Sequence, residues 1–365
     1  MSNRSPGENP PIIRAPENKG NAQQLSKRGH YTFSGEAKSF GELALTAQEE
    51  RTLEKLGITP EDLQKLLTAP PFAEGSYALL FELSDPSLNA VAKVWKNRGQ
   101  DFERGANENI VLRLLRIRHF KNAPKLKGYL QPSTILFEEK VEGETVKHFD
   151  KNQVERLASA LADLHSITFN TYGKPFGKRK KGTHLDYLLD GVETLHKIYE
   201  PFIANQTEAT DIINRSLDKM RDQAEKTANA FSDTKFTLIH FDLNKNNIIF
   251  SKKDGDPVIV DWEQASAGDN AMDIAKLFLK SNFNAGQKQD FLRVYESHQA
   301  KKDPHFQERL NVYEVFVLIN SLIWRLGVLR DVPLHMSSEN EVQFYDRVKN
   351  NLDKEIEALK NYVSK

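Results

Sequence analysis

A short β-rich segment inside a mainly helical stretch is the feature that most constrains the fold. The apolar runs 236–240 and 247–250 flank a polar loop, and a turn at 253–256 leads into a third apolar run that ends at Asp261. Short runs of this kind, bounded by turn residues, are typical of strands. We therefore expect three strands here, with the polar residues of the connecting loop held at fixed positions between them.

The periodicity of the chain changes near Gly143. Residues 71–141 contain apolar runs of strand length and one helical stretch, whereas residues 154–164 and 192–230 space their apolar residues as amphipathic helices do. Residues 315–329 are apolar on most faces, which predicts a buried helix. Strands with one helix therefore come first, and a mainly helical part follows.

These patterns predict an α+β fold with two lobes. We expect a small β-rich N-lobe over residues 46–142 and a larger, mainly helical C-lobe over residues 143–365. Residues 1–45 are predicted to be a disordered tail, because residues 1–30 are rich in proline and glycine and have few large apolar side chains to bury. A capping-box pattern that starts at Thr46 marks the first expected helix.

The composition excludes several classes of protein. The chain has 365 residues and no cysteine, which rules out disulfides, thiolate metal sites and cysteine nucleophiles. The 51 basic and 51 acidic residues balance, so nucleic acid and anionic membranes are not expected as partners. The N-terminus has no apolar signal core, and no run of 18 apolar residues occurs, so a cytoplasmic protein is expected. The sequence gives no indication of the oligomeric state.

The loop of the β segment carries the candidate chemistry. It reads His240-Phe-Asp242-Leu-Asn-Lys-Asn-Asn247, and Asp261 follows the third strand. Asp242 and Asn247 stand at opposite ends of a short loop, from which both side chains can face the same space as Asp261. Oxygen ligands from Asn247 and Asp261 suit Mg²⁺, which takes one or two protein carboxylates together with phosphate oxygens. Asp242 is left to accept a proton from a hydroxyl nucleophile, so the set suffices for phosphoryl transfer.

This region resembles the phosphotransferase enzyme family of aminoglycoside and choline kinases, which are relatives of the protein kinases. The likeness is carried by Leu238–Ile249, which contains the loop, and by Val258–Glu263 running on to Gly268–Ala275. It extends from about Pro71 to the C-terminus and is weak over residues 170–230.

The resemblance implies a bilobal protein-kinase-like fold that uses ATP and Mg²⁺. On the family's pattern Asp242 is the catalytic residue, and Asn247 and Asp261 bind the metal. His240 and Asp273 then match residues that support the catalytic loop without reacting themselves.

The expected N-lobe matches the family at two charged positions. Ala90-Val-Ala-Lys93 resembles the V-A-I-K strand, whose lysine binds the α- and β-phosphates. Glu108, on the following helix, stands where the family keeps the acid that pairs with that lysine. Lys96 and Glu103 are the alternatives for these two positions.

Two further segments match the nucleotide-binding parts of the family. Residues 137–141 resemble the hinge whose backbone receives adenine, which places Glu139 and Val141 at the base. Gly75, Ser76 and Tyr77 fall where the phosphate loop should be, although only one glycine of the G-x-G-x-x-G pattern is present.

Departures from the protein kinases point to a small-molecule acceptor. Asn244 stands where protein kinases have lysine, Asp-Trp-Glu at 261–263 replaces D-F-G, and no A-P-E segment follows. We therefore predict a kinase that phosphorylates a hydroxyl of a small molecule. The alternatives are a catalytically silent nucleotide-binding module and a protein kinase.

The acceptor itself is indicated only by scattered residues. Glu263 and Asp269 can form an acidic pocket, which favours a cation such as an aminoglycoside or an amino alcohol like choline; a solvated position is the alternative for both. Trp324 is either a cation–π wall for the acceptor or a core residue. The basic loop 178–181 is either a solvated loop or a contact for phosphate or nucleic acid.

Overall fold

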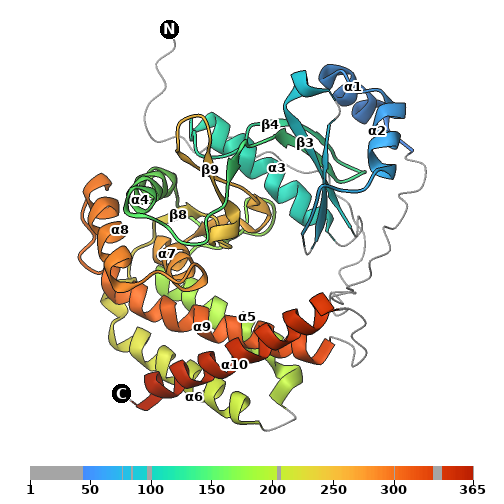
Figure 1. Ribbon diagram of the computed structural model, residues 1–365. Coiled ribbons are helices and arrows are strands. Elements are labelled where there is room, and N and C mark those ends of the chain that lie inside the picture. The colour runs from blue at the N-terminus through green and yellow to red at the C-terminus, as the bar shows by residue number, and fades with distance from the viewer. Residues whose placement is uncertain are drawn as a thin grey trace. The chain divides into compact units, whose positions relative to one another are not determined.

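A five-stranded antiparallel sheet carries the first part of the chain in this computed structural model (Figure 1). Its strands lie in the order β1-β2-β3-β5-β4. They are β1 (Ala73–Glu74), β2 (Ala78–Glu82), β3 (Ala90–Trp95), β4 (Leu126–Leu130) and β5 (Ile135–Glu139). The structure describes residues 44–75, 77–83, 85–96, 101–203, 207–299, 301–331 and 339–364. The predicted tail therefore lies almost wholly outside the described residues, as does Ser76.

Both faces of this sheet are covered, and the two faces differ in character. Helices α1 (Ala47–Leu56) and α2 (Pro60–Thr68) enclose a purely apolar cluster that includes Ala92 and Val94 of β3. Because side chains alternate along a strand, Lys93 points to the opposite face, where α3 (Phe102–Ile117) packs. A lysine inside the central strand is thus directed away from the apolar cluster.

The predicted start of the first helix is confirmed. The Thr46 hydroxyl accepts the amide of Glu49, and the Glu49 carboxylate accepts the Thr46 amide in return, which completes the predicted capping box. Glu49 also accepts the Ser133 amide at 3.0 Å, so this helix start is tied to the β4–β5 connection.

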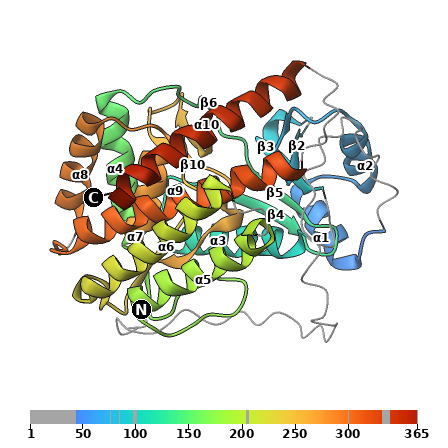
Figure 2. The same ribbon diagram turned by 90° about the horizontal axis from the view of Figure 1, so that it is seen from below.

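The remainder of the described chain is mainly helical, and the predicted α+β class is confirmed. Its helices are α4 (Lys151–His165), α5 (His184–Ile203), α6 (Glu208–Lys226), α7 (Asn270–Lys280), α8 (Ala285–His298), α9 (Phe306–Asp331) and α10 (Glu339–Ser364). Helix α9 packs against α7 and α6, and α10 lies along α9 and α6 (Figure 2). Short 3-10 turns cover Pro86–Leu88, Ala228–Phe231, Lys245–Asn247 and Trp262–Gln264.

The predicted β segment consists of strands that belong to two different sheets. Strand β8 (Phe236–Ile239) pairs with β11 (Ser266–Gly268) and β7 (Thr168–Phe169), whereas β9 (Ile248–Ser251) pairs with β10 (Pro257–Ile259) and β6 (Gly143–Glu144). The loop 240–247 therefore connects two sheets and does not close a hairpin. Gly143 is required where β6 meets β9, because a Cβ atom there would lie 2.3 Å from the Phe250 carbonyl oxygen.

Helix α9 is both long and apolar. Its segment Phe306–Arg330 is long and apolar enough to span a membrane, but more than half of it is buried inside the protein. Most of its large side chains belong to the main hydrophobic core, as expected for the central helix of a folded domain. The helix predicted over 315–329 is confirmed as buried over most of its length.

Candidate active site

Lys93 is the centre of a buried charged cluster at the face of the sheet that α3 covers. Its ammonium lies 2.7 Å from Oε2 of Glu108 and 2.5 Å from Oδ1 of Asp261, and Glu263 is 3.9 Å away. Oε1 of Glu108 accepts the backbone amide of Trp262 at 3.0 Å. Glu108 therefore ties α3, β3 and the loop after β10 together, whereas the alternative lysine, Lys96, pairs with the exposed Glu74.

A fourth carboxylate, that of Glu138, belongs to this cluster. Glu138 lies two residues beyond Leu136 on β5, and Leu136 is the register partner of Lys93. The alternation of side chains places Glu138 on the same sheet face as Lys93. It is buried, and its Oε2 atom has no hydrogen-bond partner among the described residues.

These residues, here called the Lys93 cluster, hold more carboxylates than cations. The cluster contains Lys93, Arg104, Glu108, Glu138, Asp261 and Glu263. Burial and repulsion between carboxylates raise the pKa of Glu108 to about 8 and that of Glu138 to about 7, against the attraction of Lys93. Burial alone would raise the pKa of Asp261 as well, but Lys93 holds it below its ordinary value.

Glu108, Asp261 and Glu263 present oxygens within 4.8 Å of one another, as a metal site would. However, the Lys93 ammonium already contacts two of these carboxylates directly and is buried with them. This trio therefore serves as the anionic cradle of the lysine. Asp261 differs from the other two because its side chain is 40% exposed and its backbone is left-handed, with φ at +69°. That conformation turns it out of the strand direction.

The loop between β8 and β9 presents Asp242 and Asn247 together. The Asn247 side-chain amide donates to the Asp242 carbonyl at 2.9 Å and lies 3.4 Å from the Asp242 carboxylate. The Asn247 carbonyl accepts the amide of Val260 at 3.0 Å, one residue before Asp261. The backbone thus holds Asn247 beside the loop that carries Asp261, as the motif predicted.

His240 and Asp273 hold the backbone of this loop. The Asp273 carboxylate accepts the His240 amide at 2.6 Å and the Phe241 amide at 2.8 Å. A ring nitrogen of His240 lies 2.9 Å from the Val260 carbonyl oxygen. Phe241 has φ at +64°, a conformation that costs energy for a non-glycine residue and is held here by these bonds. Their geometry fits the supporting role predicted for both residues.

Asp242 is exposed, and its surroundings are basic. Although the side chain is exposed, desolvation by the protein around it raises the pKa of the Asp242 carboxyl above the ordinary value. The positive charge of Lys276 opposes this rise most strongly. Lys276, on α7, donates to the Phe241 carbonyl. Lys276 therefore favours the ionised form of the carboxyl group that would have to accept a hydroxyl proton.

The structure argues against the acceptor role suggested for Glu263. Its carboxylate accepts the Trp95 indole N–H at 3.0 Å and a guanidinium N–H of Arg104 at 2.8 Å, and the residue is only 5% exposed. The side chain of Asn107 donates to the Glu263 carbonyl. These partners place Glu263 within the Lys93 cluster, where it cannot reach a bound acceptor.

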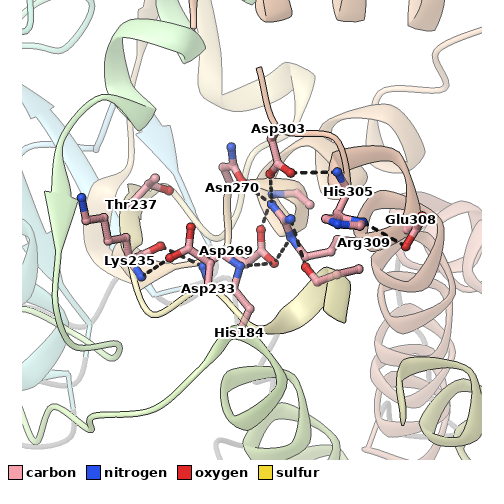
Figure 3. A network of polar contacts seen from close by, with 12 residues as sticks. His184, Asp233, Lys235, Thr237, Asp269, Asn270, Asp303, His305, Glu308 and Arg309 are labelled. Atoms are coloured by element: carbon pink, nitrogen blue, oxygen red, sulfur yellow. Dashed lines mark hydrogen bonds and ion pairs between the residues drawn. The ribbon is translucent and has the colours of Figure 1, made fainter. Parts of the chain in front are cut away.

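Asp269 is likewise enclosed by the protein's own cations (Figure 3). It caps α7 by accepting the Ala271 amide, and its other oxygen accepts a guanidinium N–H of Arg309 at 2.8 Å. Nδ1 of His184 lies 3.1 Å from the same oxygen. Burial would raise the pKa of Asp269, but Arg309 and His184 hold it far below the ordinary value. A fully buried and paired carboxylate has no position in an acceptor pocket.

The remaining predicted site residues are placed as follows. Glu139 pairs in register with Ala90 and lies 3.5 Å from Lys125, and Val141 follows β5 with its side chain half-buried. The Gly75 amide already donates to the Ala78 carbonyl at 2.8 Å, which argues against its binding a phosphate. The Tyr77 ring lies 3.6 Å from the Arg104 guanidinium.

Trp324 and the basic loop also have defined surroundings. Trp324 is 40% exposed with the Arg325 guanidinium 5.8 Å from its ring. Of the two alternatives for this residue, the core position is wrong and the acceptor contact stays a prediction. In the basic loop, Lys180 pairs with Asp190 at 2.7 Å and Arg179 donates to the Thr171 carbonyl. The loop is therefore anchored to the protein through its own charges.

Three charged residues near the site were not predicted from the sequence. Glu138 lies inside the hinge-like segment, and its position one strand period after Leu136 would have signalled its face. Lys276 lies three residues after Asp273 on the same helix, a spacing that places both on one side. Arg104 had no signal in the sequence.

Comparison with known proteins identifies the family. The sequence matches the model of the phosphotransferase enzyme family over residues 68–306, and no curated protein sequence matches the chain. A choline/ethanolamine kinase family protein from Mesorhizobium loti has a similar structure, with 17% identity and a TM-score of 0.52 over 86% of this chain and 99% of that chain. The choline kinase LicA from Streptococcus pneumoniae has 19% sequence identity and a TM-score of 0.53, over 85% of this chain and 100% of that chain.

A third solved structure, APH(2")-IIa in a ternary complex with streptomycin and ATP, gives 16% identity and a TM-score of 0.52 over 86% of this chain and 99% of that chain. At this level of identity the similarity concerns the fold, and it confirms the predicted bilobal kinase-like architecture. The family model covers well over half of the sequence. The chain therefore belongs to the phosphotransferase enzyme family.

Proposed function

We propose that this protein transfers the γ-phosphoryl group of ATP, with Mg²⁺, to a hydroxyl of a small molecule. The observation that carries the proposal is the convergence of two groups. The ion pair of Lys93 and Glu108 meets Asp261, and the Val260–Asn247 backbone bond brings Asp261 next to the loop with Asp242. The structural neighbour bound to streptomycin and ATP supports ATP as the donor.

In this proposal each residue has one task in the transfer. The acceptor oxygen attacks the γ-phosphorus, the bond from that phosphorus to the β–γ bridging oxygen breaks, and ADP leaves with the bond's electrons. The hydroxyl proton passes to the carboxylate of Asp242, which is exposed and whose ionised form is favoured by the nearby Lys276. Lys93, held by Glu108, binds the nucleotide phosphates.

Asn247 and Asp261 fit Mg²⁺ by the chemistry of their donors. The amide nitrogen of Asn247 is occupied by the Asp242 carbonyl, which leaves its side-chain oxygen for a metal. Oδ2 of Asp261 makes no hydrogen bond within the described part of the chain, while Oδ1 contacts Lys93. One carboxylate and one amide oxygen, with phosphate oxygens, are the set that Mg²⁺ prefers. When bound, Mg²⁺ would neutralise charge on the phosphates.

The lobe boundaries remain part of the proposal. We propose that residues 46–142 form the nucleotide-binding lobe and residues 143–365 the lobe that carries the catalytic loop and the acceptor. The Lys93 cluster draws its members from both, since Lys93, Arg104, Glu108 and Glu138 precede Gly143 whereas Asp261 and Glu263 follow it.

An ATP-consumption screen with the full-length chain tests the function. Wild-type protein and the Asp242→Asn variant are incubated with Mg·ATP and a panel of hydroxyl compounds of different charge, and ADP release is followed. We expect acceptor-dependent ADP release from the wild type alone. Nucleotide binding without release by either protein would favour the catalytically silent module instead.

A further inference from the structure

Two lysines of α7 carry positive charge to the catalytic loop without a carboxylate partner. Lys276 and Lys280 are one helical turn apart and share a side of the helix. The Lys276 ammonium donates to the Phe241 carbonyl and lies 4.0 Å from the Phe241 ring, and the Lys280 ammonium donates to the Ser321 hydroxyl at 2.7 Å. Both acceptors are neutral. Within the described ranges no carboxylate forms an ion pair with either lysine.

A third cation extends this basic region onto the neighbouring helices. Arg325 of α9 forms two hydrogen bonds to Glu355 of α10, at 2.9 and 3.1 Å, and Glu355 also accepts the Ser321 hydroxyl. Helices α9 and α10 lie side by side here (Figure 2). We call Lys276, Lys280, Arg325 and Glu355 the α7 cluster. Its formal charge is positive, because Glu355 neutralises only one of its three cations.

The α7 cluster lies within electrostatic reach of Asp242. Burial lowers the pKa of Lys276 to about 8, while Asp242 and Asp273 act to raise it. Burial also lowers the pKa of Lys280, where Arg325 adds repulsion and Glu355 and Asp242 add attraction. Asp273 is already bound by the loop amides of His240 and Phe241. Lys276 is buried whereas Lys280 is exposed, so the pair carries its positive charge to a surface that an anion from outside can reach.

We propose that the acceptor carries an anionic group, a carboxylate or a phosphate, beside its reacting hydroxyl, and that Lys276 and Lys280 bind this group. The proposal rests on the proposed function only for the position of the hydroxyl at Asp242. It replaces the cationic acceptor expected from Glu263 and Asp269, since both of these carboxylates are buried and paired within the protein.

Binding of simple oxyanions tests the site without any turnover. The full-length protein is saturated with Mg²⁺ and a non-hydrolysable ATP analogue to fill the nucleotide site, and inorganic phosphate or acetate is titrated against chloride at constant ionic strength. We expect phosphate to raise the melting temperature of the wild type. Lys280→Gln should weaken phosphate binding about tenfold, and Lys280→Arg, which keeps the charge, should restore it.

The exposed Lys226 of α6 provides the matched control. Lys226→Gln removes one positive charge, as Lys280→Gln does, but from a helix that does not belong to the α7 cluster. Its response to phosphate should equal that of the wild type. Equal responses of the wild type and Lys280→Gln, or no response of the wild type, would overturn the anion site.

A matched acceptor panel then separates the two sources of the anion and the two proposals. Glycerate and glycerol 3-phosphate differ from glycerol by one carboxylate or phosphate, and ethanolamine represents the cations. Preference for glycerate or for the phosphate ester identifies the anion, and Lys280→Gln should remove that preference. Phosphorylation of ethanolamine in preference to both overturns the inference and leaves the proposed function standing. Oxyanion binding without transfer to any acceptor would contradict the proposed function alone.

Discussion

The Lys93 cluster and the α7 cluster lie next to the same catalytic loop but carry opposite formal charge. The first has four carboxylates against Lys93 and Arg104, and the second has three cations against Glu355. A third buried network, around Asp269, is different, because His184 and Arg309 enclose its carboxylate and Asp303 pairs with Arg309 in turn (Figure 3). Only this last network satisfies its charges internally.

The balance of charge within each network distinguishes charged residues that stabilise the fold from those that bind a ligand. Burying an ion is unfavourable unless it is paired, so a network with balanced charges completes the fold itself. A network with an excess of one sign is stabilised by a ligand of the other sign. On this reasoning the Lys93 cluster would be stabilised by a cation, namely the Mg²⁺ that Asp261 and Asn247 are proposed to bind. The α7 cluster would be stabilised by an anion.

The largest expected effect comes from removing Asp242, which lies between the two clusters. Asp242→Asn should lower kcat about 10²- to 10⁴-fold while ATP binding stays nearly unchanged, because the carboxylate acts on the acceptor hydroxyl. Steady-state kinetics and nucleotide titration measure the two effects. Since the pKa of Asp242 is raised, wild-type kcat should fall on the acid side at a higher pH than for an ordinary aspartate. A variant with more than a tenth of the wild-type kcat would place the base elsewhere.

Removing Asp261 tests the negative side of the comparison. Asp261→Ala should weaken Mg·ATP binding by at least the roughly 10- to 100-fold that the loss of a metal's supporting partners costs, and should leave metal-free ATP binding almost unchanged. Calorimetry with and without Mg²⁺ separates the two. Asn246→Ala is the control, because Asn246 is an exposed residue of the loop that carries Asp242 and Asn247. An equal loss in both titrations would contradict the metal role of Asp261.

Glu138 makes the excess of carboxylates visible in the pH dependence of stability. Its pKa in the folded state is raised to about 7, so between the ordinary value and pH 7 the folded chain keeps a proton that the unfolded chain has lost. The free energy of unfolding of the wild type should therefore fall as pH rises through this window. Glu138→Gln cannot ionise and should gain about 1–3 kcal/mol over the wild type at pH 8 but not at pH 4.

Urea denaturation at the two pH values measures this gain. Glu139→Gln, at the next residue of β5, is the control, because the Glu139 side chain is partly exposed and lies near the exposed Lys125. If Glu138→Gln were no more stable than the wild type at pH 8, the Lys93 cluster would not hold an excess of negative charge.

The sequence predicted the parts of the site that short segments define. Asp242 and Asn247 are separated by a fixed loop, and Lys93 faces α3 because strand side chains alternate. The pairing of Glu108 with Lys93 followed from the family pattern, and the structure has the two 2.7 Å apart. The roles of these residues in catalysis remain predictions. The strand order was less accessible, since β8 and β9 flank one loop yet belong to different sheets.

The charge around the site could not be predicted, because it depends on residues far apart in the sequence. The position of Glu263 in the sequence favours an acceptor contact, whereas in the fold its carboxylate accepts from Arg104 and the Trp95 indole. The surroundings of Lys280 come from α9 and α10. Ser321 is 41 residues from Lys280 in the sequence, and Glu355, which accepts the Ser321 hydroxyl, is another 34 residues on. No local sequence pattern indicates which of these charged side chains contact one another in the fold.

The smallest expected effect concerns the excess of positive charge in the α7 cluster. Glu355→Gln removes the only carboxylate of the α7 cluster and frees Arg325, so the formal excess of positive charge rises from two to three. Oxyanion affinity in the Lys280 titration should then increase by less than about 1 kcal/mol, because Glu355 is linked to the exposed Lys280 only through the Ser321 hydroxyl. Glu357→Gln, an exposed change on the same helix, should have no effect on that affinity. Weaker oxyanion binding in Glu355→Gln than in this control would show that Glu355 organises the cations for their ligand instead of competing with it.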